Sequence, residues 1–391
     1  MPAPESLHHR LDASVDSFAT KLRELSLRIH ANPELRFAEH RAAQWIAETV
    51  TENSSAPVER PLGGLDTALR ARVGTRAPRV AILAEYDALP EIGHACGHNL
   101  IAAGAVGAFL ALAANANDLP GGFDLVGTPA EEGGGGKISL LDAGAFSDVD
   151  AAMMFHPFDH DLLAHDTLAN SWIAMQFKGT ASHAAVAPFE GQSALSACMN
   201  TFHLVDSQRV HFRDGVRVHG YVTNGGQAVN IIPEHAACEF SVRATTLPEL
   251  DRVREIVERC ARAAAMAGGV EIEIVRRRGY KNMVNNLPLA RAFGTHMKRL
   301  GRTPKERDPN IGTGSTDMGD VSHRVPAIHA WVAICNAGET TCHQHAFAEC
   351  ARSERGMTGM LLAAKSMAST AADFLFDAKL REDVRGAYEA R

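Results

Sequence analysis

Short apolar runs alternate with longer apolar stretches over the first part of the chain. The short runs are rich in aliphatic and β-branched residues and predict buried strands at residues 79–83, 123–128 and 151–155. Helices are predicted within residues 7–48, with a break at Asn32-Pro33, and at 100–114 and 138–145. Strands that alternate with helices indicate a largely parallel sheet with helices on both of its faces.

Near residue 168 the pattern changes to segments in which apolar and polar residues alternate. These segments predict half-buried strands at residues 171–178, 216–223, 236–245 and 270–275. Helical patterns at 192–210 and 248–267 complete a β-α-β-β-α-β order, which is that of a split βαβ, ferredoxin-like domain. From residue 282 the first pattern resumes, with a strand at 327–334 and a last helix near 353–375.

The predicted fold class is therefore α/β with an inserted α+β domain. Residues 1–167 and 282–391 would form a catalytic domain built on a mostly parallel sheet. Residues 168–281 would form the insertion between its two halves.

The composition narrows the classes of function. Hydrophobic residues make up 46% of the 391 residues and charged residues 22%, as in ordinary soluble globular proteins. With 39 basic against 46 acidic side chains, the net charge of −7 indicates no electropositive surface. We expect a small-molecule substrate and no nucleic-acid partner.

Neither the apolar stretches nor the cysteines indicate a membrane or an oxidising compartment. Residues 100–114 form the longest charge-free apolar stretch, which is shorter than the ~20 residues that span a bilayer. The seven cysteines are an odd number without framework spacing, and the first residues lack the pattern of a signal peptide. We expect a cytoplasmic protein without a membrane partner.

Metal-binding residue types follow three of the predicted strands. Cys96 and His98 follow the first strand, Glu131 and Glu132 the second, and His156 the third. Because the carboxyl ends of parallel strands line one crevice, these side chains can converge. Imidazole, thiolate and carboxylate together suit zinc, manganese or cobalt. The alternative is that Cys96 is a buried free thiol and the other residues are ordinary polar groups.

The adjacent glutamates suit two different tasks. On an extended strand successive side chains point apart, so one glutamate could hold a metal while the other takes a proton from water and passes it to a leaving amine. The alternative is a pair of solvated charges before a turn. The glycines at 133–136 before Lys137 do not fit a phosphate loop, because no hydroxyl residue directly follows the lysine.

Several motifs, in order along nearly the whole chain, resemble those of one family of dinuclear metallohydrolases. This family includes aminoacylase, carnosinase, carboxypeptidase G and the plant auxin-conjugate amidohydrolases. The matching segments are HANPEL at 30–35, AEYDALP at 84–90, HACGHN at 94–99, PAEEG at 129–133, SH at 182–183, VNIIP at 229–233 and STDMG at 315–319.

The resemblance implies two divalent metal ions, zinc or manganese. It assigns them to five ligands, Cys96, His98, Glu132, His156 and His343. Of the two histidines near the C-terminus, His343 is preferred because the family's ligand stands four residues before a phenylalanine, here Phe347. His345 is the second candidate.

The resemblance also implies the roles of other residues. Glu131 would be the general base, and Asp87 the carboxylate that orients a metal ligand. His183, in the inserted dimerisation or lid domain, would support the oxyanion in the site of a partner subunit, which implies a homodimer. Apart from the resemblance, three residues, Asn230, Arg243 and Ser315, are candidates for substrate binding, because the planar guanidinium of an arginine binds a carboxylate well. Arg243 within a strand could equally form a structural ion pair.

The expected reaction is hydrolysis of an amide bond by a hydroxide that bridges the two metal ions. Asn99 and Glu85 depart from the usual family residues and resemble the subgroup of aminobenzoyl-glutamate hydrolases and β-alanyl dipeptidase-like proteins. The substrate would be a small N-acyl amino acid, an aminobenzoyl-glutamate-like conjugate or a dipeptide. The alternatives are metal-dependent deamination or displacement on a non-peptide small molecule, and a non-catalytic metal-binding protein of this fold.

Overall fold

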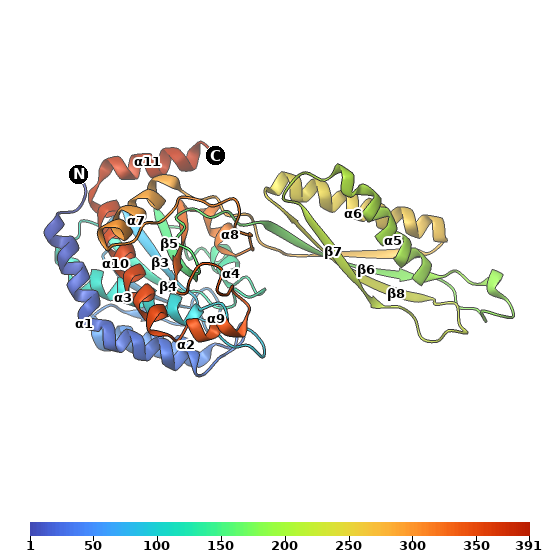
Figure 1. Cartoon of the computed structure of the whole chain (residues 1–391), viewed down its shortest axis with the longest axis horizontal. Coiled ribbons are helices and arrows are strands. Elements are labelled where there is room, and N and C mark those ends of the chain that lie inside the picture. The colour runs from blue at the N-terminus through green and yellow to red at the C-terminus, as the bar shows by residue number, and fades with distance from the viewer. The chain divides into compact units, whose positions relative to one another are not determined.

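The computed structural model describes residues 1–391, and the chain forms two compact units. The first unit comprises Met1–Asp166, Met283–Thr313 and Asp317–Arg391. The second comprises Thr167–Asn282 and the short segment Gly314–Thr316. The second unit is therefore inserted in the chain between parts of the first (Figure 1).

The first unit contains a six-stranded sheet in the order β1-β2-β4-β3-β5-β10. Its strands are β1 (Val58–Glu59), β2 (Leu69–Val73), β3 (Arg79–Ala84), β4 (Gly122–Gly127), β5 (Ala151–Phe158) and β10 (Ala327–Ala333). Strands β4, β3, β5 and β10 are parallel, whereas β1 and β2 are antiparallel at one edge. The predicted α/β class with a mostly parallel sheet is confirmed.

Helices cover both faces of this sheet. They are α1 (Glu5–His30), α2 (His40–Asn53), α3 (His98–Ala114), α4 (Gly136–Asp142), α7 (Leu287–Arg299), α8 (Met318–Ser322), α9 (His345–Cys350), α10 (Glu354–Phe376) and α11 (Ala378–Glu389). Every residue of β3 is buried. Val80 and Ile82 belong to the core under α1, α3 and α10, and Ala81 and Leu83 to a second core beside α4 and α8. This two-sided burial explains why the strand is apolar throughout.

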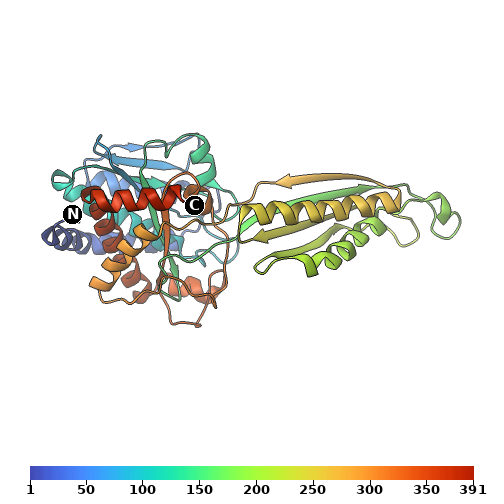
Figure 2. The same cartoon turned by 90° about the horizontal axis from the view of Figure 1, so that it is seen from above.

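The second unit is a four-stranded antiparallel sheet with two helices. Along the chain it consists of β6 (Ala169–Lys178), α5 (Ala194–Gln208), β7 (Arg217–Asn224), β8 (His235–Ala244), α6 (Leu247–Gly268) and β9 (Glu271–Arg277). The strand order is β7-β8-β6-β9. Helices α5 and α6 pack against each other and the sheet, and Figure 2 shows them along the strands. This is the β-α-β-β-α-β arrangement that the alternating segments predicted.

The helix predicted near residues 353–375 is confirmed as α10, but the prediction that it is the chain's last helix is wrong, because α11 follows it. Val384 is the only buried residue of α11. Only Leu380 and Val384 of this helix pack on the core, and so short an apolar stripe gives the sequence only a weak helical signal. Among the helices, none combines the length and the apolar character that crossing a lipid bilayer requires.

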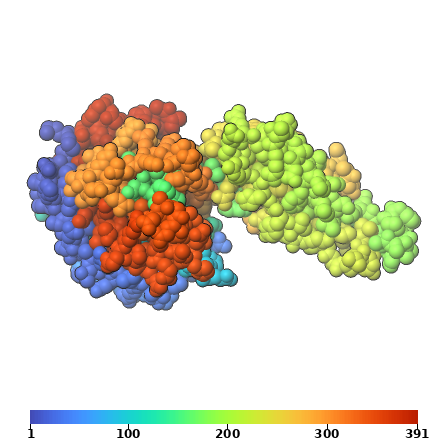
Figure 3. All heavy atoms as spheres, in the orientation of Figure 1, coloured from blue at the N-terminus to red at the C-terminus, as the bar shows by residue number.

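The N-terminal segment meets helix α10 of the first unit at a cluster around Asp373. In Figure 3, blue N-terminal and red C-terminal atoms occupy the same face of this unit. The Asp373 carboxylate lies 2.7 Å from His296 Nε2 and 3.2 Å from His8 Nε2, and it accepts a hydrogen bond from the Ala3 amide at 2.9 Å. Burial alone would raise the pKa of Asp373, but the two histidines outweigh it and hold this pKa well below its usual range.

Asp373→Asn should lower the free energy of unfolding at pH 7 by about 3 kcal/mol, because it removes one partner of a buried ion-pair cluster. The folded-state pKa lies below the unfolded value of ~3.9, so this stability is present above that value and is lost as the pH falls. Urea unfolding at pH 7 and at about pH 3 should therefore show a smaller effect at the lower pH.

The control is Asp16→Asn, which removes an exposed pair with Lys365 between α1 and α10. This variant should lower the free energy of unfolding by less than about 1 kcal/mol. If Asp373→Asn lowered the free energy of unfolding equally at both pH values, the ion pairs of Asp373 with the two histidines would not be the cause of its effect.

Candidate metal centre

The predicted donors of the first unit gather at the carboxyl ends of its parallel strands. Cys96 lies in the loop after β3, and His98 is the first residue of α3. Glu132 follows β4, His156 lies within β5, and His343 lies between β10 and α9. In a parallel sheet these strand ends form one edge, which brings together residues that are far apart in the sequence.

A glycine shapes the loop that carries the cysteine and the histidine. Gly97, between Cys96 and His98, has a φ of +78°, in the left-handed region. A Cβ atom at this position would lie 2.9 Å from Pro157 Cγ and 3.6 Å from Phe347 Cε1. Gly97 therefore allows the loop to pack against both the end of β5 and helix α9.

Asp87 connects two of the donor-bearing loops. Its Oδ1 accepts a hydrogen bond from His98 Nδ1 at 2.9 Å, and its Oδ2 accepts one from the Glu132 amide at 2.8 Å. The first bond fixes the orientation of the His98 ring and leaves Nε2 as the nitrogen able to bind a metal. These are the contacts that the predicted orienting role requires.

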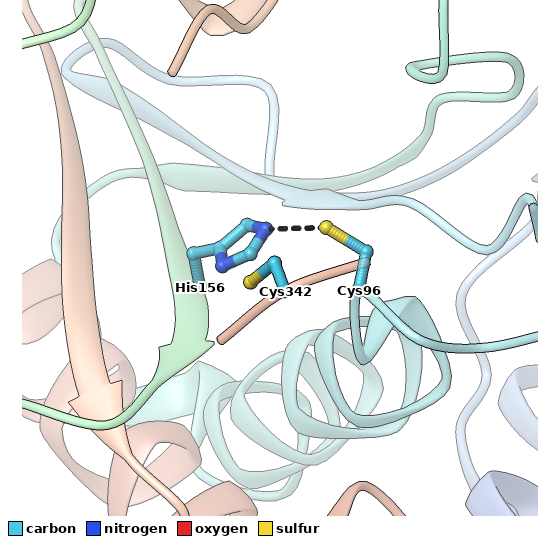
Figure 4. A group of neighbouring side chains, drawn as sticks. All are labelled: Cys96, His156 and Cys342. Atoms are coloured by element: carbon cyan, nitrogen blue, oxygen red, sulfur yellow. Dashed lines mark hydrogen bonds between the residues drawn. The ribbon is translucent and has the colours of Figure 1, made fainter. Parts of the chain in front are cut away.

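Pairs of donor atoms lie at the separations that two ligands of one metal ion have. Cys96 Sγ lies 3.4 Å from His156 Nε2, and Figure 4 shows the cysteine pointing at the histidine ring. His343 Nε2 lies 3.2 Å from Glu132 Oε1. Zinc bound tetrahedrally to nitrogen, oxygen or sulfur spaces its ligands about 3.3–3.6 Å apart, so the first distance lies within this range and the second lies just below it.

Two buried atoms without a hydrogen-bond partner also indicate that these residues suit a metal. His98 Nε2 and Glu132 Oε1 are buried but form no hydrogen bond, and a donor atom of each lies within 4.8 Å of Cys96 Sγ. Burial lowers the pKa of His156 to about 4, which keeps its imidazole neutral and able to bind a metal ion. The residues present therefore fit the expected group.

His343 and His345 differ clearly in their surroundings. The His343 amide donates a hydrogen bond to the Ala95 carbonyl at 2.9 Å, which ties its loop to the cysteine loop. Its φ of +68° is unusual for a residue with a side chain and is often found at functional sites. Both histidines are exposed, but His343 contacts the predicted ligand Glu132, whereas His345 is the first residue of α9.

The two adjacent glutamates lie in a turn, and the expectation of an extended strand there is wrong. Strand β4 ends at Gly127, and the Gly133 amide donates a hydrogen bond to the Glu131 carbonyl at 2.6 Å. Glu131 is buried. Burial, reinforced by the nearby carboxylates of Glu85 and Glu132, raises the pKa of Glu131 well above its usual range.

The other predicted site residues belong to the second unit, where they form two pairs. The segments of His183 and Asn230 lie side by side, because the Ala184 amide donates a hydrogen bond to the Asn230 carbonyl at 3.0 Å. Arg243 Nη1 lies 3.4 Å from Ser315 Oγ. His183 and Asn230 are exposed, whereas Arg243 and Ser315 are partly buried.

Other polar residues beside the donors were not assigned roles from the sequence. Cys342 Sγ lies within 4.8 Å of Cys96 Sγ and of a ring nitrogen of His156 (Figure 4). Contact with Cys342, together with burial, raises the pKa of Cys96 well above its usual range. Buried Lys137 Nζ donates hydrogen bonds to Glu85 at 2.6 Å and Asp317 at 2.7 Å. The lysine after four glycines was the only sequence feature that pointed to this group, and it did not identify Glu85 and Asp317 as partners because they are distant in the sequence.

Comparisons with known proteins agree on one family. The family model described as peptidase family M20/M25/M40 matches residues 81–371. The Xaa-Arg dipeptidase of Mus musculus is 37% identical over 404 residues, which cover 99% of this chain and 93% of that protein. A p-aminobenzoyl-glutamate hydrolase component of Escherichia coli K12 is 27% identical, with 97% and 94% covered. A Bacillus subtilis structure, described as a dinuclear metal-binding M20 peptidase, has a TM-score of 0.72 at 21% identity and covers 92% of this chain and 99% of its own.

Gly97→Ala should lower the free energy of unfolding through both backbone strain and overpacking. Gly144 is a matched control, because its φ is +77° and a Cβ atom there would meet nothing within 4 Å. Gly144→Ala should cost about 1 kcal/mol for the left-handed backbone alone. Gly97→Ala should cost about 1–3 kcal/mol more, because its Cβ would meet Pro157.

The measurement is urea unfolding of chelator-treated protein, so that bound metal does not contribute to stability. Equal losses for the two alanine variants would show that the Cys96 loop can move away from Pro157.

Proposed function

Because the chain belongs to the M20/M25/M40 peptidase family and is thus a metal-dependent hydrolase of small amide or peptide substrates, we propose that it is a dipeptidase with Glu131 as its general base. The convergence of metal donors beside this buried glutamate is the observation that carries the proposal. Its metal ligands would be Cys96, His98, Glu132, His156 and His343.

The donor set suits two divalent ions, zinc or manganese, since thiolate and imidazole favour zinc and carboxylate also suits manganese. When bound, such ions polarise the amide carbonyl and lower the pKa of water. Glu131 accepts the proton of the attacking water on its carboxylate and then gives it to the departing amine. Asp87 keeps His98 in the tautomer that leaves Nε2 for the metal.

The substrate proposed is a dipeptide whose C-terminal residue is basic. Support comes from the 37% identity, over nearly the whole chain, to a protein named Xaa-Arg dipeptidase. Arg243, with Ser315 beside it, would hold the substrate's terminal carboxylate, because a guanidinium binds a carboxylate through two parallel hydrogen bonds. Arg243 contacts Ser315 rather than a carboxylate of its own chain, and burial lowers its pKa. Asn230 would contribute a further polar contact.

We also propose a homodimer in which His183 supports the oxyanion in the partner's site. Strand β7 is an edge of the second unit's sheet and exposes Tyr221 and Val222. An exposed edge strand with apolar side chains favours pairing with another chain. Val229, close to Asn230 in the sequence, is also fully exposed. These apolar residues would be covered by the second copy.

A cytoplasmic location remains part of the proposal. All seven cysteines are free thiols, which suits a reducing compartment.

The function is tested by amine release from a panel of Xaa-Arg dipeptides, other dipeptides, aminobenzoyl-glutamate and N-acyl amino acids. Protein loaded with zinc or manganese should hydrolyse dipeptides, and chelator-treated protein should not. Glu131→Gln should keep the bound metal while turnover falls about a hundredfold or more, because only the proton transfer is lost. Glu132→Gln is the matched comparison and should lose metal as well as activity.

Near wild-type activity in the Glu131→Gln variant would remove Glu131 as the base. Release of ammonia in place of an amino acid would indicate a deaminase or a related reaction on a different electrophile.

The exchange of His183 between subunits predicts complementation. His183→Ala and Glu131→Gln proteins should each be nearly inactive, yet a mixture that exchanges subunits should regain about a quarter of wild-type activity. Half of its dimers are mixed, and one of the two sites in each mixed dimer has both residues. No recovery, with subunit exchange verified, would show that His183 does not act on the partner's site.

A further inference from the structure

Glu85 is a buried carboxylate to which the proposed function gives no role. It directly follows β3 and is fully buried. Its Oε2 accepts a hydrogen bond from Lys137 Nζ at 2.6 Å. Its Oε1 lies 3.3 Å from His98 Nε2, yet neither of these buried atoms forms a hydrogen bond. One oxygen is therefore anchored, and the other faces a predicted metal ligand.

The position of this free oxygen fits a shared metal ion. An ion bound tetrahedrally at about 2.0–2.2 Å holds its nitrogen and oxygen ligands about 3.3–3.5 Å apart. The distance from Glu85 Oε1 to His98 Nε2 lies in this range. One donor atom each of Glu85, His98 and His156 lie within 4.8 Å of one another. Two imidazoles and one carboxylate form a common donor set for divalent transition metals.

We propose that Glu85 is a further metal ligand, which binds the ion held by His98 and His156, and that Lys137 positions its carboxylate. The inference rests on the metal centre of the proposed function and adds a sixth protein ligand to it. Because Lys137 shares the carboxylate, Glu85 neutralises less of the metal's charge than an unpaired glutamate would. The ion therefore keeps more of its ability to polarise a substrate carbonyl.

Asp317 keeps Lys137 in place. Its Oδ1 accepts a hydrogen bond from Lys137 Nζ at 2.7 Å, and its Oδ2 accepts one from the Lys137 amide at 3.1 Å. Both residues are fully buried. Two carboxylates thus surround one ammonium group, which fixes the lysine side chain and, through it, Glu85. This gives the lysine after the glycine run a role that needs no phosphate.

A simple ion pair between Glu85 and His98 explains the contact less well. His98 already donates its Nδ1 proton to Asp87. A charged ring would also donate its Nε2 proton to Glu85, but the geometry of the 3.3 Å contact forms no hydrogen bond. A carboxylate oxygen and an imidazole nitrogen that both bind one metal ion would lie close together in this way without forming a hydrogen bond.

The direct test is a crystal structure of the wild-type protein loaded with zinc. Glu85 Oε1 should lie about 2.0–2.2 Å from one of the ions, as a bound carboxylate does. Chelator competition provides the second readout. Glu85→Gln should weaken the binding of one of the two ions about tenfold or more and leave the other unchanged.

Asp124→Asn is the matched control for removing a buried carboxylate that has a cationic partner. Asp124 lies on β4 and pairs with Arg79 at 2.7 Å, outside the donor clusters. This variant should bind both ions as the wild-type protein does. The crystal structure of the zinc-loaded wild-type protein shows whether Glu85 binds an ion even if Glu85→Gln does not fold.

Two negative outcomes separate this inference from the proposed function. The sixth ligand is excluded if the wild-type protein binds two ions and Glu85 lies more than about 3 Å from both. It is also excluded if Glu85→Gln binds both ions as tightly as the wild-type protein does. In either case the proposed function stands. If the wild-type protein binds no divalent ion, the proposed metal centre itself is wrong.

Discussion

The arrangement of the candidate site depends most on the two hydrogen bonds that the Asp87 carboxylate accepts. One of its oxygens accepts a hydrogen bond from the His98 ring and the other from the Glu132 backbone. It thereby joins the loop after β3 to the turn after β4, so that the relative position of two donor groups does not depend on strand register alone. Because Asp87 is fully buried, these bonds have no competition from water and are correspondingly strong.

Buried charge is the second constraint on this region. Carboxylates at Glu85, Asp87 and Asp317 are almost completely excluded from solvent, and Lys137 is the buried ammonium group among them. Buried ions are costly unless opposite charges compensate them. Divalent ions would supply the missing positive charge at the donor atoms, so that metal binding and the stability of this edge of the sheet would be coupled. The same residues would thus serve both folding and chemistry.

The sequence predicts the features that arise from local patterns and misses those that arise from distant pairs. Apolar runs identify the parallel strands, and their order brings Cys96 and His156 to one edge of the sheet. The contact of Lys137 with Asp317 spans 180 residues and has no local signal. An extended strand was expected at Glu131, but this residue lies in a turn because β4 already ends at Gly127. Choosing His343 over His345 required the family pattern, since both are histidines in one short segment.

The proposed roles divide between the two units in a way that separates reaction from selection. The metal donors and Glu131 come from the first unit, where a buried parallel sheet fixes strand ends and tolerates little change. Arg243 and Ser315 belong to the second unit, an antiparallel sheet with one exposed face on which substitutions cost little stability. If Arg243 and Ser315 bind the substrate as proposed, changes in the second unit would alter which carboxylate-bearing molecule is held without disturbing the metal ligands. A common reaction with varied substrates, as the names of the dipeptidase and aminobenzoyl-glutamate hydrolase relatives indicate, is the expected consequence of this division.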